Sequence, residues 1–226
     1  MEVTNLEFYR IEKDRIRENL NKYTRKAFGI LPRLNNPQIL DVGCGTGVPT
    51  IELAKISGGK ITGFDIDTAS LVLLRRKIRE TGLTNKISVI NSPLRKILFP
   101  EESFDIVWAE GSVFILGFRS SLRKWHPLLR PEGFLVIHDD IENKTAKLRF
   151  IRKGGYRLID HFDLPASCWW NEYYKPLESL IDKFRTRFPD DPELYNELNK
   201  DKFEIDRGRK DPDRISSFYV IMQKNN

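Results

Sequence analysis

Cysteine, histidine and methionine are all scarce in this chain of 226 residues, which contains two, three and two of them respectively. Two cysteines, Cys44 and Cys168, are too few for a disulfide framework, so we expect free thiols in a reducing compartment. No apolar run approaches the roughly 20 residues of a membrane span. The first residues also lack the basic start and apolar core of a secretory signal. These absences predict a cytoplasmic protein with no membrane partner.

A concentrated charge of one sign is missing as well. The formal net charge is +6, but the basic residues are spread along the whole chain, which disfavours nucleic acid as a partner. Internal repeats, low-complexity tracts and linkers are also absent. The length suits one α/β domain with a few insertions, so we expect a single domain over residues 1–226.

The most informative stretch begins at Gln38. A short apolar run over 39–42 predicts a buried strand, and Gly43, Gly45 and Gly47 then follow at alternate positions. Glycines at this spacing allow a tight turn and let a ligand approach the backbone without obstruction by Cβ atoms. A helix begins after the turn, and its first N–H groups suit the polar part of a cofactor. Asp65, at the end of the next apolar run, is placed to bind both hydroxyls of a ribose.

Four segments together resemble a known family. Asp-Val-Gly-Cys-Gly-Thr-Gly at 41–47 is similar to the glycine motif of class I S-adenosylmethionine-dependent methyltransferases, and 63–67 to their acidic second motif. Residues 103–108 and 128–135 resemble the fourth strand and the turn before the fifth. The resemblance is closest to the small-molecule, ubiquinone-biosynthesis-like branch (methyltransferase types 11 and 25). A dinucleotide-binding domain fits less well, because Val48 stands where its third glycine belongs.

This resemblance implies a Rossmann-like α/β fold. Its seven-stranded sheet is mostly parallel, with an antiparallel last strand and helices on both faces. The amphipathic residues 6–28 predict one or two helices, so we expect 1–36 to form a helical cap. The cofactor-binding half is then 37–140 and the substrate side 141–226.

The resemblance also implies S-adenosyl-L-methionine as the cofactor. Its methionine end would lie at the glycine turn, its ribose at Asp65 and its adenine near Asn91 and Ser92. The family often has an acidic residue at this last position, and this chain does not. The predicted cofactor-binding residues are Asp41, Gly43, Cys44, Gly45, Gly47, Asp65, Ile66, Asn91, Ser92 and Glu110.

The predicted catalytic residues are Glu110 and His138, which follow or end the fourth and fifth strands, where open parallel sheets bind ligands. Either side chain could remove a proton from an amine or hydroxyl acceptor. Glu110 could equally cap a helix or pair with a lysine. Metal binding by His138, Asp139 and Asp140 is disfavoured, because adjacent strand residues point to opposite faces. We therefore predict no metal.

An aromatic segment in the last third of the chain is the predicted substrate site. It contains Trp169, Trp170, Tyr173 and Tyr174, and such side chains suit the wall of an acceptor pocket. The alternative is that the two tryptophans anchor a helix onto the sheet.

The sequence thus predicts methyl transfer to a small-molecule acceptor by a monomer or homodimer. An Asn- or Asp-Pro-Pro-Tyr motif after the fourth strand, typical of enzymes that methylate DNA amines, RNA or protein glutamine, is absent. The alternatives are an RNA or protein methyltransferase and a non-catalytic S-adenosylmethionine-binding accessory protein.

Overall fold

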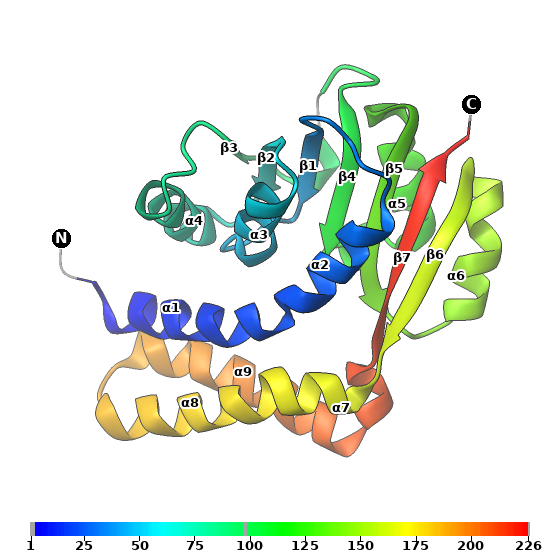
Figure 1. The fold of residues 1–226 in the computed structure, drawn as a ribbon. Helices are drawn as coiled ribbons and strands as arrows, with labels where there is room; N and C mark the ends of the chain where they lie inside the picture. Colours follow the sequence, from blue (N-terminus) through cyan, green and yellow to red (C-terminus); the bar gives the residue numbers. More distant parts are fainter. Residues whose placement is uncertain (1–2, 97–98, 226) are drawn as a thin grey trace.

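A seven-stranded sheet runs through the molecule and has helices on both faces (Figure 1). The computed structural model describes residues 3–96 and 99–225. The strand order is β3-β2-β1-β4-β5-β7-β6, and only β7 is antiparallel to its neighbours, which confirms the predicted fold class. The strands are β1 (Gln38–Val42), β2 (Lys60–Asp65), β3 (Ile87–Asn91), β4 (Phe104–Glu110), β5 (Leu129–Asp140), β6 (Tyr156–Leu164) and β7 (Ser217–Lys224).

The helices form two layers. Helices α2, α3 and α4 contribute buried residues to the core on one face of the sheet, and α5 and α6 contribute to the core on the other. The α-helices are α1 (Asn5–Arg17), α2 (Asn21–Ile30), α3 (Val48–Ile56), α4 (Thr68–Glu80), α5 (Phe118–Trp125), α6 (Lys144–Ile151), α7 (Ala166–Trp169), α8 (Lys175–Arg187) and α9 (Pro192–Lys210). A π-helical turn, Trp170–Tyr174, joins α7 to α8, and 3-10 turns span Glu18–Leu20, Leu94–Lys96, Val113–Ile115, His126–Leu128, Arg152–Gly154 and Pro212–Ile215.

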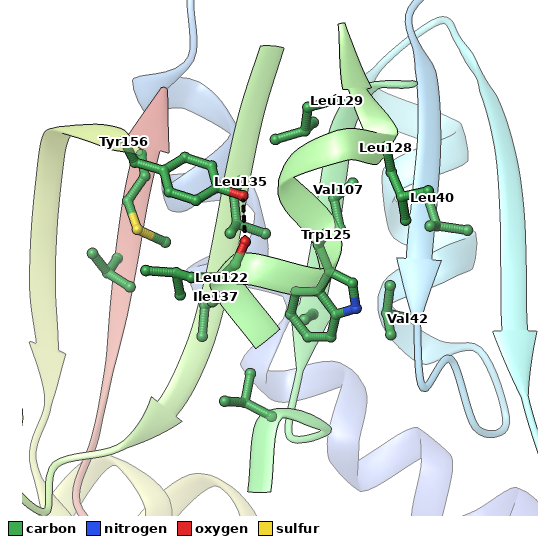
Figure 2. Packing of buried hydrophobic residues seen from close by; sticks show 14 of the residues in the cluster. Leu40, Val42, Val107, Leu122, Trp125, Leu128, Leu129, Leu135, Ile137 and Tyr156 are labelled. Atoms are coloured by element: carbon green, nitrogen blue, oxygen red, sulfur yellow. Dashed lines mark hydrogen bonds between the residues drawn. The ribbon is translucent and has the colours of Figure 1, made fainter. Parts of the chain in front are cut away.

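Large side chains from α5 and the sheet fill the core on the second face (Figure 2). Trp125 and Tyr156 are fully buried there. The Tyr156 hydroxyl donates to the Leu122 carbonyl at 3.0 Å, so the one polar group of that ring is satisfied inside the core. This packing holds α5 against β4 and β5 and fixes the position of the two strands that carry Glu110 and His138.

Helix α1 passes beneath the carboxyl ends of the parallel strands, with α8 and α9 on its other side (Figure 1). Its start is fixed by a capping box, in which Thr4 and Glu7 exchange hydrogen bonds. Tyr9 donates to Asp201 at 2.6 Å, and Lys13 pairs with the same carboxylate at 2.6 Å. These contacts tie α1 to α9 and place it over the edge where ligands bind.

Two elements extend beyond their predicted limits. The sequence pattern predicts a helix over 192–198 and a loop or solvated helix after it, whereas α9 continues to Lys210, because Asp201, Ile205 and Gly208 are buried. Strand β5 already begins at Leu129. The predicted turn over 131–133 therefore lies within the strand, as an irregularity in its register with β4.

Candidate active site

The glycine turn between β1 and α3 has the backbone geometry that its sequence predicted. Gly43, Gly45 and Gly47 have φ values of 74°, 51° and 81°, in the left-handed region that favours glycine. The N–H groups of Gly43 and Cys44 donate to the Phe64 carbonyl at 2.7 and 3.2 Å, which fixes the turn to β2. A Cβ atom at Gly45 would meet nothing within 4 Å. The turn therefore leaves free space at Gly45 for part of a ligand.

Asp65 lies beside this turn at the carboxyl end of β2. Its Oδ2 accepts from the Gly45 N–H at 2.7 Å, and its Oδ1 accepts from the Asp67 N–H at 2.9 Å. Each carboxylate oxygen can accept a further hydrogen bond, so both hydroxyls of a ribose fit this group. Asp67 caps α4 by accepting from the Ala69 N–H.

The residues predicted for adenine lie next to Asp65. Asn91 is opposite Asp65 in the β2–β3 register, and its side-chain amide donates to the carbonyls of Asp65 and Ile66 at 3.3 and 3.0 Å. The Ser92 N–H donates to the Asp65 carbonyl at 2.9 Å. Ile66 is 61% exposed, which is high for so apolar a side chain. A flat apolar base would cover it.

Asp41, near the end of β1, and Cys44, within the glycine turn, are both buried. Asp41 is buried and accepts from the Thr50 hydroxyl at 2.6 Å. Burial raises the pKa of Asp41 to about 7, with smaller contributions from the charges of Glu110 and Asp65 and an opposing one from Thr50. Burial also raises the pKa of the Cys44 thiol, which therefore stays protonated at neutral pH.

Glu110 ends β4 and accepts from three donors. Its Oε2 receives the Arg17 guanidinium at 3.0 Å, while its Oε1 receives the Thr24 hydroxyl at 2.8 Å and the Trp108 indole N–H at 2.9 Å. The side chain is 3% exposed. Donors to both oxygens hold this buried carboxylate in one position.

His138 lies opposite Glu110 on β5 and opposite Tyr219 on β7, so the three side chains share one face of the sheet. Its ring stacks on Tyr219 at 4.5 Å and on Trp169 at 5.6 Å between centroids. Its Nε2 lies 2.8 Å from the Ser217 hydroxyl, which accepts from the Trp169 indole at 2.7 Å. Burial lowers the pKa of His138 to about 4, so the ring is neutral at physiological pH.

The low pKa of His138 predicts a stability loss in mild acid. An unfolded histidine has a pKa of about 6.5, so between that pH and about 4 the unfolded chain binds more protons than the folded one. Stability should therefore fall as the pH drops through this window. We expect the fall to be on the order of 2–3 kcal/mol smaller in His138→Gln than in the wild type, measured by urea unfolding at pH 7 and pH 4. If both proteins lost the same free energy of unfolding between pH 7 and pH 4, the low pKa of folded His138 would be contradicted.

The four aromatic residues of the predicted substrate site separate in the structure. Trp169 faces β5 through its stack on His138, and its ring lies 5.9 Å from Tyr173 and 6.0 Å from Tyr174 between centroids. Trp170 instead packs toward α9, with the Arg209 guanidinium 5.0 Å from its ring centre. The rings of Trp169, Tyr173 and Tyr174 therefore form one continuous aromatic cluster beside Glu110 and His138. Trp170 instead anchors its segment to α9.

Residues from the N-terminal helices complete this edge of the site. Arg17 and Thr24 bind Glu110, and on the side of the glycine turn Thr46 donates to Asp14 at 2.7 Å. Lys77 contacts the same Asp14 carboxylate. None of these pairings is detectable from the sequence, because an amphipathic pattern gives the buried face of a helix but not its partners.

Asp139 and Asp140, the neighbours of His138, pair with Lys147, each at 2.8 Å. Within 3–96 and 99–225, no three histidine, cysteine or acidic side chains are grouped so that they could hold a metal ion. The same residues include no helix of sufficient length and apolarity to cross a membrane.

Comparison with known proteins agrees with this geometry. Residues 39–133 match the family model described as a methyltransferase domain. A methyltransferase from Thiobacillus denitrificans, solved with S-adenosyl-L-homocysteine, superposes with a TM-score of 0.70 at 15% identity, over 92% of this chain and 91% of its own. Residues 39–133 thus form a methyltransferase domain, and the chain has the fold of S-adenosylmethionine-dependent methyltransferases. S-adenosylmethionine is the cofactor of this enzyme family, and the glycine turn with Asp65 fits it.

Curated relatives of this chain are methyltransferases by name, and one of them names a sterol. Sterol 24-C-methyltransferase ERG6B of Gibberella zeae is 26% identical over 70% of this chain and 48% of its own length. Methyltransferase GfsG of Streptomyces halstedii is 29% identical over 58% of this chain and 48% of its own length. The chain thus spans about half the length of these relatives.

Proposed function

We propose that this protein transfers a methyl group from S-adenosylmethionine to a small-molecule acceptor by in-line displacement. One observation carries the proposal. The glycine turn and Asp65 lie on one side of Glu110, and the aromatic cluster lies on the other side. A donor site and an acceptor site would then meet at the carboxyl ends of β1 and β4. Aligning two bound reactants in this way supplies much of the rate enhancement.

The chain's residues have separate tasks in this proposal. The glycine turn binds the methionine end, Asp65 the ribose, and Ile66 with Asn91 and Ser92 the adenine. The bound cofactor supplies an activated sulfonium methyl group. Glu110 places a fixed negative charge beside that group. His138 is too weak a base to drive proton removal. We propose that it instead orients Ser217 and the aromatic rings around it.

An open pocket adjoins the proposed acceptor side. It has a volume of about 640 Å³ and lies between the end of β5 and α9. Tyr174, whose ring contacts Trp169 and Tyr173, lines it. Its volume lies in the range of about 300–1,000 Å³ that is typical of small-molecule sites, but Arg17, Glu110, His138 and Trp169 do not line it, so it is a neighbour of the proposed acceptor site.

Incubation with methyl-labelled S-adenosylmethionine and fractionated cell extracts tests the proposal. We expect label to enter the small-molecule fraction with wild-type protein and not with Asp65→Asn. Label that appears only in RNA or protein would overturn the small-molecule assignment. Its absence from every fraction would overturn the proposed activity.

A further inference from the structure

Arg17, the last residue of α1, has a terminal nitrogen with no partner. Its Nη2 pairs with Glu110 at 3.0 Å, and its guanidinium carbon lies 5.7 Å from the centre of the Trp169 ring. Its Nη1 is buried, and the described residues offer that atom no hydrogen-bond acceptor. The guanidinium therefore lies beside the Trp169 ring with one terminal nitrogen bonded and the other without an acceptor.

Glu110 does not accept a hydrogen bond from Nη1 in this structure. Oε2 takes Nη2 of Arg17, and Oε1 takes the donors of Thr24 and Trp108. A buried donor left without an acceptor is destabilising, and a charged donor more so. A ligand oxygen at Nη1 would remove this cost.

The charges around Arg17 indicate what kind of oxygen fits. Arg17 and Glu110 cancel each other, the nearby Lys13 and Asp201 form a second neutral pair, and His138 carries no charge at physiological pH. A sulfonium placed beside Glu110 would leave this group with one positive charge in excess. A carboxylate on the acceptor would restore neutrality, and guanidinium groups bind carboxylates well.

We propose that Arg17 anchors a carboxylate of the methyl acceptor through Nη1, with the body of the acceptor against Trp169 and Tyr173. The inference rests on the proposed methyl transfer and adds to it a substrate class, namely small carboxylic acids with a flat or apolar body. It assigns to α1 a role in substrate selection as well as in covering the site.

Three probes that share a benzyl group and differ in charge test the proposal: phenylacetate, phenylacetamide and benzylamine. Each is titrated by calorimetry, at millimolar concentration, into protein saturated with S-adenosyl-L-homocysteine. We expect phenylacetate to bind at least about tenfold more tightly than the other two, as expected for a charge-assisted contact worth about 1.5 kcal/mol or more. Benzylamine would bind best if the acidic residues around the cavity, such as Asp140 and Glu204, selected a cation instead.

The matched variants are Arg17→Lys and Arg15→Gln. Lysine keeps the ion pair with Glu110 but lacks the second terminal nitrogen of the guanidinium. Arg15 lies on an exposed part of α1 and contacts only Glu12 among the described ion pairs. We expect Arg17→Lys to abolish the preference for phenylacetate with unchanged affinity for S-adenosyl-L-homocysteine, and Arg15→Gln to change neither.

Three results would overturn the assignment of Arg17. They are failure of phenylacetate to bind the wild type preferentially, an undiminished preference in Arg17→Lys, and an equal loss of S-adenosyl-L-homocysteine affinity in that variant. The last result would place Arg17 at the cofactor. Wild-type protein that does not bind S-adenosyl-L-homocysteine at all would instead contradict the proposed function, so the two failures are distinguishable.

Discussion

Asp65→Ala should weaken S-adenosylmethionine binding by at least about a hundredfold. Hydrogen bonds to a charged group contribute about 1.5–3 kcal/mol each, and the proposed ribose contact has two of them, so the loss exceeds the roughly 2.7 kcal/mol that corresponds to a hundredfold. The alanine also removes the acceptor for the N–H groups of Gly45 and Asp67. The glycine turn would then lose part of its support together with the ligand contact.

Calorimetric titration with S-adenosylmethionine measures this effect. Asp67→Asn is the matched control, because its carboxylate is two residues away and serves as the cap of α4. We expect the control to bind within a few-fold of the wild type. An Asp65→Ala protein that binds with undiminished affinity would place the ribose elsewhere.

Gly47→Ala should destabilise the fold by about 2–5 kcal/mol. Its φ of 81° lies in a region that costs an L-residue roughly 1–2 kcal/mol. A Cβ atom there would also approach Leu74 Cδ1 to 2.1 Å, and overpacking of a core adds about 1–3 kcal/mol. Leu74 is fully buried, so it has little room to move away. Urea denaturation of the two proteins gives the difference directly.

Gly45→Ala separates stability from ligand binding within the same turn. Its φ of 51° brings a similar backbone cost, but its Cβ would contact nothing within 4 Å. We expect a loss of only about 1–2 kcal/mol in the free energy of unfolding. Cofactor affinity should nevertheless fall, since the methyl group would occupy space assigned to the methionine end. Equal destabilisation by the two alanines would contradict this account of the turn.

The sequence predicted the parallel strands and the glycine turn well, because each depends on local residues. The apolar run before Gly43 forms β1, and Asp65 ends β2 next to the turn, as the spacing indicated. The extent of α9 was harder to predict. Its second half is rich in charged residues, and its helical form depends on the burial of Asp201 and Ile205 against α1, a contact between the two ends of the chain.

On the proposed acceptor side, long-range contacts decided even more of the arrangement than in α9. Sequence reasoning named Glu110, His138 and the aromatic segment separately, and it could not show that β5 and β7 align His138 with Tyr219. It also could not identify Arg17 as the partner of Glu110, because 93 residues separate them in the chain. An alternation of polar and apolar residues specifies which face is buried, but not which neighbour covers it.

The sequence by itself thus determined the family and the cofactor of this protein. A glycine turn and a nearby carboxylate bind a ligand largely through the backbone and one side chain, so a few contiguous residues specify them. Only the tertiary structure decided the proposed acceptor side, where Arg17, Glu110, His138, Trp169 and Tyr219 come together from α1, β4, β5, α7 and β7. Their arrangement depends on helix packing and strand order, which no single segment of the chain encodes.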